Sequence, residues 1–271
     1  MKILTLVSGK GGVGRTTLTL NLAYAMAQRG FRVLAAEVDP AAGFRQALPA
    51  MKESNGVARW MTGTPLSQCY TETRIDTLKI LEVGPIPLRD RGEFHEELAS
   101  GSQVRRLAKE AGEEGFDLLM LDTPAGLAGA TLGAIRGGEY VLVPVQAEPL
   151  AARALIPLLE GLAELRNEGA TGVLTGFVVN MFQQRDPDSL SVVLDLWSSF
   201  PPLLVLESVI PRDPIFGRAS TLGVPVALLR RQAPPMARVF EQLAEEVEYR
   251  LGLRPYPENE EDEDKPICLF S

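Results

Sequence analysis

Residues 8–17, Ser-Gly-Lys-Gly-Gly-Val-Gly-Arg-Thr-Thr, combine four glycines with two cations and two adjacent threonines. Glycine tolerates positive φ, so several backbone N–H groups can turn toward one anion. The segment satisfies the phosphate-loop pattern G-x-x-x-x-G-K-[ST], except that Arg15 stands where the pattern has lysine. A second cation, Lys10, lies early in the loop. We therefore predict a site for nucleotide phosphates, because a plain glycine turn requires neither Lys10 nor the Thr16-Thr17 pair.

Acidic residues follow two apolar runs. Glu37 and Asp39 come at the end of the run 31–38, and Asp122 comes directly after the run 116–121. An aspartate in such a place can simply stabilise a turn. Beside a phosphate loop it can also hold Mg²⁺, with a threonine hydroxyl as a direct ligand. The loop favours the second reading, so the candidate metal ligands are Thr16, Asp39 and Asp122, and we expect Asp39 to orient an attacking water.

These residues need a scaffold, and the pattern of apolar runs predicts one. Near-continuous apolar runs indicate strands covered on both faces, as in a mostly parallel sheet. Helical segments alternate with them, which predicts an α/β fold with one doubly wound sheet flanked by helices. Ligands of such sheets bind beyond the carboxyl ends of the strands. The expected strands are 2–8, 31–38, 78–83, 116–121, 140–145, 172–179 and 203–210, and the expected helices 16–29, 102–114, 149–167, 187–198 and 233–251.

The length of 271 residues allows one large α/β domain or two small ones. We find no internal repeat and no interdomain linker, so we predict one domain over 1–252 and an acidic, disordered tail over 253–271. Only two cysteines occur, Cys69 and Cys268, far apart. That usage fits a reducing cytoplasm. Apolar runs stay below the ~18 residues of a membrane span, and the first expected strand leaves no room for a signal peptide, so we expect a cytoplasmic protein that does not enter membranes.

The formal net charge of −8 argues against indiscriminate binding of nucleic acid, but the charge is unevenly spread. The tail is strongly acidic. One basic segment stands out in the body, where five arginines accompany a single acid, Asp213. These candidates for contact with DNA are Arg212, Arg218, Arg230, Arg231 and Arg238. They can equally be solvated surface residues or ion-pair partners.

The ordered motifs resemble the ParA/MinD superfamily. The loop K-G-G-V-G-R-T-T, the V-D-P segment at 38–40 and the L-D-T-P-A-G segment at 121–126 are similar to its deviant Walker A, switch I and switch II motifs. The resemblance continues through 143–149, 178–181, 210–213 and 223–225, and covers roughly residues 1–250. It implies a P-loop NTPase fold, ATP and ADP as ligands with Mg²⁺, and a homodimer that forms on ATP binding.

The resemblance also implies roles for single positions. Lys10 matches the signature lysine that reaches the partner's phosphates in an ATP-sandwiched dimer, and Asp39 and Asp122 match the catalytic and Walker B aspartates. Two departures stand out. Arg15 keeps the charge of lysine but is bulkier and forked, which predicts slow or partner-stimulated hydrolysis, and Ala41-Ala42-Gly43 lacks the polar residue usual after this proline. The positions implied to bind the nucleotide are Gly11, Gly12, Val13, Gly14, Arg15, Thr16, Thr17, Asn180, Pro211, Arg212 and Asp213.

Three functions remain open at this point. The first is a ParA-like ATP switch that positions DNA or a protein assembly, with nonspecific DNA binding, association with the nucleoid, and a protein partner that stimulates hydrolysis or is the cargo. The second is an accessory regulator of a secretion or polysaccharide-export machine, as in the BcsQ and CpaE branches. The third is a scaffold that dimerises on ATP without hydrolysing it.

Overall fold

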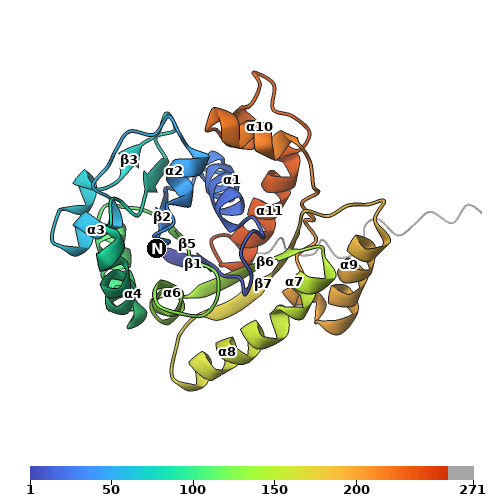
Figure 1. Ribbon diagram of the computed structural model, residues 1–271. Helices are drawn as coiled ribbons and strands as arrows, with labels where there is room; N and C mark the ends of the chain where they lie inside the picture. The colour runs from blue at the N-terminus through green and yellow to red at the C-terminus, as the bar shows by residue number, and fades with distance from the viewer. Residues whose placement is uncertain (256–271) are drawn as a thin grey trace, which may run out of the picture.

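The computed structural model describes residues 1–255, and its sheet is arranged around the first strand, β1 (Lys2–Leu6). β1 lies between β5 (Leu118–Asp122) and β6 (Tyr140–Gln146), and β7 (Val173–Asn180) flanks β6. On the other side follow β2 (Val33–Glu37), β4 (Leu78–Leu81) and the short β3 (Thr71–Glu72). Every neighbouring pair is parallel except β3 with β4 (Figure 1). The mostly parallel doubly wound sheet predicted from the sequence is thus confirmed.

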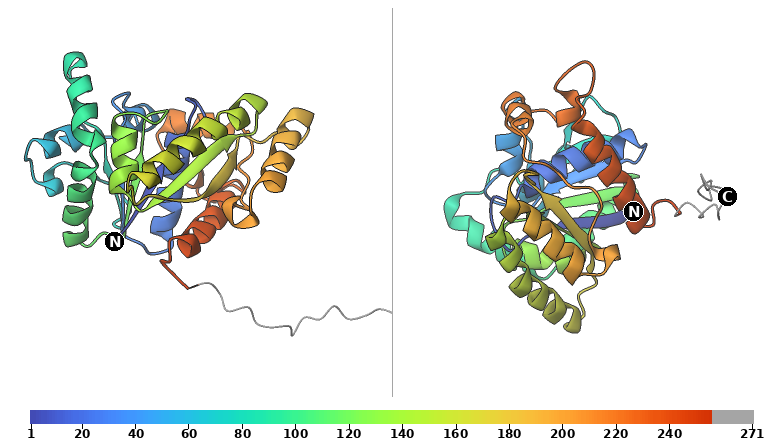
Figure 2. Two further views of the ribbon diagram at one scale, coloured as in Figure 1. Left: turned by 90° about the horizontal axis from the view of Figure 1, so that it is seen from below. Right: turned by 90° about the vertical axis from the view of Figure 1, so that its right-hand side faces the viewer.

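Helices cover both faces of the sheet. Since successive strand residues point to opposite faces, each strand contributes side chains to both helical layers. In β5, Leu118 and Met120 pack with the cluster under α1 and α11, while Leu119 and Leu121 pack with the cluster under α4 and α5. Figure 2 shows the sheet between these layers. The helices are α1 (Arg15–Gln28), α2 (Gly43–Ala47), α3 (Gly56–Met61), α4 (Arg91–Ala99), α5 (Ser102–Glu113), α6 (Ala130–Gly137), α7 (Pro149–Arg153), α8 (Leu155–Asn167), α9 (Pro187–Ser199), α10 (Ile215–Leu222) and α11 (Ala237–Arg250), with 3-10 turns η1 (Leu66–Gln68), η2 (Leu88–Asp90), η3 (Pro202–Leu204) and η4 (Val226–Leu228).

The strand predicted over 203–210 is wrong. Residues 202–204 form η3, and the stretch that follows has an isolated bridge between Val205 and Phe177 and single hydrogen bonds from Leu206 and Ile210 to β7, but no continuous strand ladder. A side chain of α11 explains the difference, because the Glu246 carboxylate accepts the backbone N–H groups of Glu207 at 2.7 Å and Ser208 at 2.8 Å. Those donors are therefore unavailable to a strand ladder.

The five predicted helices are confirmed, although the one over 149–167 is divided into α7 and α8 at Ala154. None of the helices in residues 1–255 combines the length and apolar character needed to cross a membrane. Most of the tail predicted over 253–271, including its acidic run and Cys268, lies outside the described residues.

Parallel pairing decides where the polar residues gather. The carboxyl ends of β1, β2, β5, β6 and β7 lie along one edge of the sheet, since these strands run in one direction. That edge carries the glycine-rich loop after β1, Asp39 beyond β2, and Asp122, which ends β5. Asn180, at the end of β7, completes the row. The topology therefore brings distant parts of the sequence to one site.

Candidate functional site

The loop between β1 and α1 depends on its glycines for both conformation and space. Gly12 and Gly14 have φ of +77° and +87°, which disfavours other residues. A Cβ on Gly14 would lie 2.5 Å from Nδ2 of Asn180, which itself donates to the carbonyl of Val13 at 2.7 Å. A Cβ on Gly9 would lie 2.9 Å from the carbonyl of Ala154. The loop is therefore held close to the ends of β7 and α7.

Thr16 and Asp122 meet at the start of α1, as the sequence predicts for a metal site. The Thr16 hydroxyl donates to Oδ2 of Asp122 at 2.6 Å, and Asp122 is 1% exposed. Burial raises the pKa of the Asp122 carboxyl to about 6, against the opposing effects of the Thr16 hydrogen bond and the Arg15 charge. The carboxylate is thus placed without enough protein donors to stabilise its charge.

Arg15 turns back onto its own loop. Its Nη1 donates to the Ser8 hydroxyl and, at 3.4 Å, to the carbonyl of Lys10. Burial lowers the pKa of the Arg15 guanidinium, while the nearby carboxylates of Asp122 and Asp39 act in the opposite direction. The Arg15 guanidinium is therefore close to the acids of the site, and only part of its hydrogen-bonding capacity is used.

Unsatisfied atoms show what the site lacks. Within residues 1–255, four buried side-chain atoms have no hydrogen-bond partner. Two of them have an ion-pair partner, since Glu110 lies 3.4 Å from Nε of Arg106 and Arg254 lies 2.7 Å from Oε1 of Glu248. The remaining two are Nε of Arg15 and Oδ1 of Asp122. Buried polar atoms without partners are costly, so this pair indicates a place for an external anion and an external cation.

The donor set suits magnesium better than a transition metal. The described residues contain no group of three or more His, Cys, Asp or Glu side chains arranged to hold a metal. A threonine hydroxyl and one buried carboxylate are oxygen ligands, and Mg²⁺ commonly takes its other ligands from water and substrate phosphates. Thr16 and Asp122 therefore fit a magnesium ion that is bound together with a phosphorylated ligand.

Asp39 lies in a tight turn after β2. Its Oδ1 accepts the backbone N–H of Ala41 at 2.8 Å, and Ala42 has a positive φ of +56°. The next residue, Gly43, approaches the metal candidate, because a Cβ there would lie 2.9 Å from Oγ1 of Thr16. The turn of Asp39 is therefore followed by a residue, Gly43, that lies against Thr16.

Glu37 is the strand-end acid to which the sequence assigned no role. It is fully buried, and its Oε1 accepts the N–H of Phe44 at 2.9 Å while its Oε2 accepts that of Val83 at 3.4 Å. Burial raises the pKa of this carboxyl to about 8. Glu37 fixes the start of α2 to the end of β4, so it positions the segment that carries Asp39.

A cavity of about 300 Å³ opens beside the loop. Six residues predicted to bind a nucleotide line it: Gly14, Thr17, Asn180, Pro211, Arg212 and Asp213. Five apolar residues that were not predicted also line it, among them the aromatic Phe216 and Phe240. These two phenylalanines belong to α10 and α11, and only the folded chain brings them to the loop. A small, partly apolar pocket next to a phosphate loop is suited to a nucleoside base.

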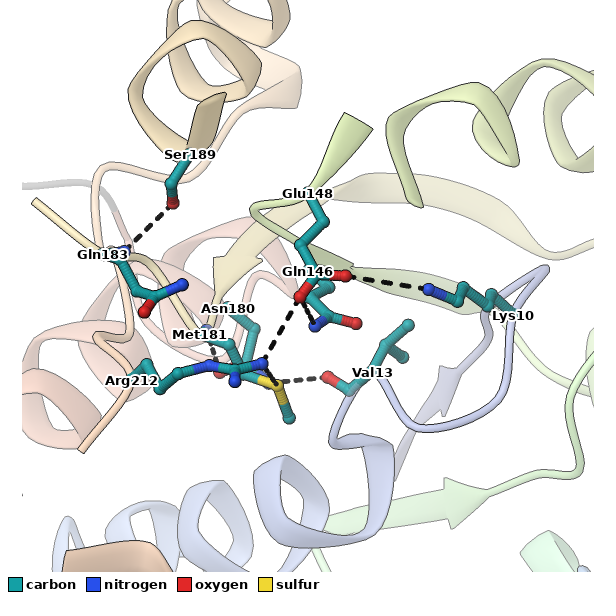
Figure 3. Close-up of polar contacts among 9 residues, drawn as sticks. All are labelled: Lys10, Val13, Gln146, Glu148, Asn180, Met181, Gln183, Ser189 and Arg212. Atoms are coloured by element: carbon teal, nitrogen blue, oxygen red, sulfur yellow. Dashed lines mark hydrogen bonds and ion pairs between the residues drawn. The ribbon is translucent and has the colours of Figure 1, made fainter. Parts of the chain in front are cut away.

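Glu148, another residue that the sequence did not reveal, joins two of the predicted ones (Figure 3). Its carboxylate lies 3.9 Å from Nζ of Lys10 and 3.4 Å from Nη2 of Arg212. Gln146 also donates to it at 2.6 Å. In this conformation Lys10 therefore points toward the end of β6 in its own chain.

The comparisons with known proteins agree with this geometry. A family model described as an AAA domain matches residues 1–173, well over half of the chain. The chromosome-partitioning ATPase Soj of Thermus thermophilus is 34% identical over 251 residues, which cover 92% of this chain and 96% of that protein. The chain belongs to the ParA/MinD superfamily of ATPases.

Two further members of the superfamily extend the likeness. The sporulation initiation inhibitor protein Soj of Bacillus subtilis is 27% identical over 260 residues, covering 91% of this chain and 98% of that one. The structure of the septum site-determining protein MinD from Pyrococcus horikoshii, complexed with Mg-ADP, has a TM-score of 0.72 at 25% identity. It covers 93% of this chain and 98% of MinD. The P-loop NTPase fold of the ParA/MinD type is thereby confirmed.

The five arginines of this ParA/MinD-superfamily chain that were predicted as candidates for DNA contact fall into two groups. Arg212 lines the nucleotide-sized cavity and pairs with Glu148, so it belongs to the site. The other four are exposed, and their side chains make no ion pair or hydrogen bond within residues 1–255; they lie on α10, after η4 and at the start of α11: Arg218, Arg230, Arg231 and Arg238. We call these four residues, which have no ion-pair partner within residues 1–255, the free basic surface.

Proposed function

We propose that this chain is a magnesium-dependent ATP switch that dimerises around two ATP molecules, hydrolyses them slowly and positions a cargo, either DNA or a protein assembly. The observation that carries the proposal is the pair of unsatisfied buried atoms, Nε of Arg15 and Oδ1 of Asp122, at one glycine-rich loop. An ATP phosphate would supply an acceptor for Nε of Arg15, and a magnesium ion would supply a positive charge to Oδ1 of Asp122. The relatives named as partitioning ATPases support the same reading.

The residues present fit the ligands. Thr16 and Asp122 would hold Mg²⁺ together with the segment of Asp39, and the N–H groups of 11–17 would hold the phosphates. Bound Mg²⁺ would neutralise charge on the phosphate oxygens. Asn180, Pro211 and Asp213 would line the base, since they border the cavity beside Gly14. Asp39 orients water from a turn that packs on Thr16.

The position and exposure of Lys10 support dimerisation. Two nucleotides enclosed between protomers concentrate negative charge in a partly dehydrated cleft, where a cation from the opposite protomer is strongly favoured. Lys10 is half-exposed, and within residues 1–255 its ammonium group has only a long contact to Glu148, so breaking that contact costs little. ATP then acts as a switch because it stabilises only the assembly that holds it.

Light scattering after gel filtration, combined with nucleotide binding, tests this function. We expect the wild type to be monomeric with ADP and dimeric with Mg-ATP, Lys10→Ala to bind ATP as a monomer, and Asp122→Asn to lose magnesium-dependent binding. Glu160→Ala on the exposed face of α8 is the matched control and should behave as wild type. A wild type that binds no ATP, or that dimerises equally with no nucleotide, would overturn the proposal.

A non-hydrolysing scaffold is the second candidate, and the Arg15 contacts favour it. Arg15 is bonded to Ser8 and Lys10 of its own loop, so its guanidinium must rearrange to serve a phosphate. Single-turnover hydrolysis by the wild type and by Arg15→Lys separates the candidates. We expect slow wild-type hydrolysis that Arg15→Lys accelerates at least tenfold. A wild type that is already fast and unaffected by the substitution would contradict the role assigned to Arg15.

DNA is the cargo that the free basic surface supports, whereas a regulator of an export machine would not need it. Contacts to phosphate release counterions, so we expect ATP-dependent DNA binding that falls steeply with salt. The double variant Arg230→Glu/Arg231→Glu should abolish it. Arg166→Glu/Arg185→Glu alters two exposed arginines elsewhere and is the matched control. Equal loss in both variants, or binding without ATP, would favour the export-machine reading.

A further inference from the structure

Residues of α3, of α4 and of the segment between β4 and α4 line a groove of about 740 Å³. It shares no lining residue with the cavity beside the glycine-rich loop. Apolar side chains from three elements line it: Ala58 and Met61 of α3, Ile86 of the loop after β4, and Phe94 of α4. The groove is therefore large enough for side chains of another molecule and apolar enough to retain them.

The rim of this groove carries charge that the protein leaves uncompensated. Glu93 and Glu97 lie one turn apart on α4, exposed, and neither forms an ion pair within residues 1–255. Asp90, also on the rim, is paired with Arg89 at 3.3 Å, and Arg59 is the cation among the lining residues. An apolar floor beside free carboxylates complements a segment with one apolar face and flanking lysines or arginines.

The charge also argues against the chain's own sequence as the occupant. The stretch 258–264 holds six acids, so the rim of Glu93 and Glu97 would repel it. Leu88, two residues before Asp90, is 81% exposed and adds apolar surface next to the rim. The observations favour a cationic amphipathic segment of a different protein.

The floor of the groove is fixed to the segment after β4. The N–H groups of Val57 and Ala58 donate to the carbonyls of Glu82 and Val83 at 2.9 and 3.0 Å. Gly56 and Gly84 pass so closely that a Cβ on either would lie 2.5 Å from the backbone of the opposite segment. A shift of α3 would therefore move residues 82–84.

Trp60 holds the opposite side of α3. It is 1% exposed, its Nε1 donates to Glu110 at 2.7 Å, and the guanidinium of Arg106 lies 4.0 Å from the ring centroid. The indole thus ties α3 to α5, while Ala58 and Met61 face the groove. Contact with these two residues acts on a helix that is held on both sides.

Residues 82–83, to which α3 is bonded, are also bonded to α2 and to Glu37 at the end of β2. Glu82 is buried, and its carboxylate accepts two hydrogen bonds from Arg45 of α2, at 2.9 and 3.1 Å. The N–H of Val83 donates to Glu37, which also binds the N–H of Phe44 in α2. Because α2 begins directly after the turn of Asp39, residues 82–83 connect the groove to that turn.

We propose that the α3–α4 groove binds a cationic amphipathic segment of a protein partner, and that this binding alters nucleotide turnover through Glu82, Arg45 and the Asp39 turn. The docking part of the proposal depends only on the lining and charge of the groove. The effect on turnover rests on the proposed ATP-switch function.

Docking is tested with a fluorescent 18-residue helical peptide of leucine and lysine and with its leucine–glutamate counterpart. On full-length protein we expect the lysine peptide to bind at least tenfold more tightly than the glutamate peptide. Glu93→Lys/Glu97→Lys should weaken it at least tenfold. Glu160→Lys/Glu164→Lys on α8 reverses two exposed acids of the same spacing and should leave binding unchanged. Equal loss in both variants, or equal binding of the two peptides, overturns docking at the groove.

The connection is tested in Arg45→Gln, which removes the link to Glu82 and leaves the groove lining intact. We expect the lysine peptide to change the single-turnover rate or the ATP affinity of the wild type at least threefold, and to bind Arg45→Gln equally well without that change. An Arg45→Gln protein that responds like the wild type overturns the connection. If the ATP-switch function itself is wrong, all variants fail to bind ATP while peptide binding keeps its pattern, so the two failures are distinguishable.

Discussion

Two carboxylates, Asp122 at the end of β5 and Glu82 after β4, are buried to the same extent but differ in the number of hydrogen bonds they accept. Both are 1% exposed. Glu82 accepts a forked pair of hydrogen bonds from Arg45 and two more from the N–H and hydroxyl of Ser54. Within residues 1–255, the Asp122 carboxylate accepts a hydrogen bond from Thr16 on Oδ2, and its Oδ1 has no partner.

The difference separates structural from functional acids. A buried charge is tolerated when protein groups fill its bonding capacity, and Glu82 meets that condition. Asp122 does not, and burial raises the pKa of its carboxyl to about 6 as a result. Within residues 1–255, no hydrogen-bond donor contacts Oδ1 of Asp122. An unpaired carboxylate oxygen of this kind is free to coordinate a metal ion.

The largest expected effect tests the structural side of the comparison. Glu82→Ala leaves the Arg45 fork and both Ser54 donors without their acceptor, and because the Arg45 side chain is 41% exposed we expect the free energy of unfolding to fall by about 3 kcal/mol in urea titrations. Glu53→Ala is the matched control, because Glu53 lies 4.0 Å from the same arginine with its side chain 91% exposed. It should cost less than about 1 kcal/mol. Equal losses would mean that burial does not distinguish these acids.

Asp122→Asn should show the opposite profile. We expect magnesium-dependent ATP affinity to fall at least 100-fold, about 2.7 kcal/mol, since the amide cannot supply the ligand charge. Stability measured in EDTA at pH 8 should stay the same or rise, because the variant no longer ionises a buried carboxyl. Calorimetric titration and urea unfolding give the two values. A variant that loses stability and keeps ATP affinity would assign Asp122 to the structural class.

Gly14→Ala carries the comparison from the acid to the loop. A residue with a side chain at φ +87° costs about 1–3 kcal/mol, and here the new Cβ also meets Asn180. Gly30→Ala is the control, since it has φ +96° with no atom within 4 Å. Gly14→Ala should therefore lose more stability than Gly30→Ala, and only Gly14→Ala should lose nucleotide affinity, by at least tenfold. Equal nucleotide affinity in the two variants would mean that the loop does not bind the nucleotide.

The smallest effect concerns Cys69, whose carbonyl accepts the N–H of Gly56 at the start of α3. Burial raises the pKa of its thiol to about 11. In a Cys268→Ser protein, labelling by a disulfide reagent should be slow at pH 8 and rise about tenfold per pH unit toward pH 11, because the thiolate reacts. Ionisation is disfavoured in the folded state, so stability should fall as pH rises from about 9 to 11. Rapid labelling at pH 8 would show that this region opens easily.

Local signals account for what the sequence predicted well. Glycine spacing located the loop, and the strand-end aspartate led to Asp122, which the structure finds 2.6 Å from Thr16. Near-continuous apolar runs identified six strands, because burial on both faces leaves little room for polar residues. The roles of these site residues remain predictions.

Distant partners explain what it missed. Glu148 lies far from Lys10 in the chain, and Glu82 is 37 residues from Arg45, so no local pattern reveals either contact. The strand over 203–210 failed because Glu246 captures its donors. Short helices such as α2 arise from tertiary contacts, here Glu37 with Phe44, rather than from periodicity. The position of Glu148 directly after an apolar strand was the one available signal.

The anchoring of α3 by Trp60 has an optical consequence. The chain has two tryptophans, and they differ in solvent contact, with Trp60 at 1% and Trp197 at 49% exposure. In a Trp197→Phe protein the emission comes from a single indole on the helix that lines the groove. A neutral quencher such as acrylamide would then report any loosening of α3 as an occupant arrives, in real time and without an attached dye.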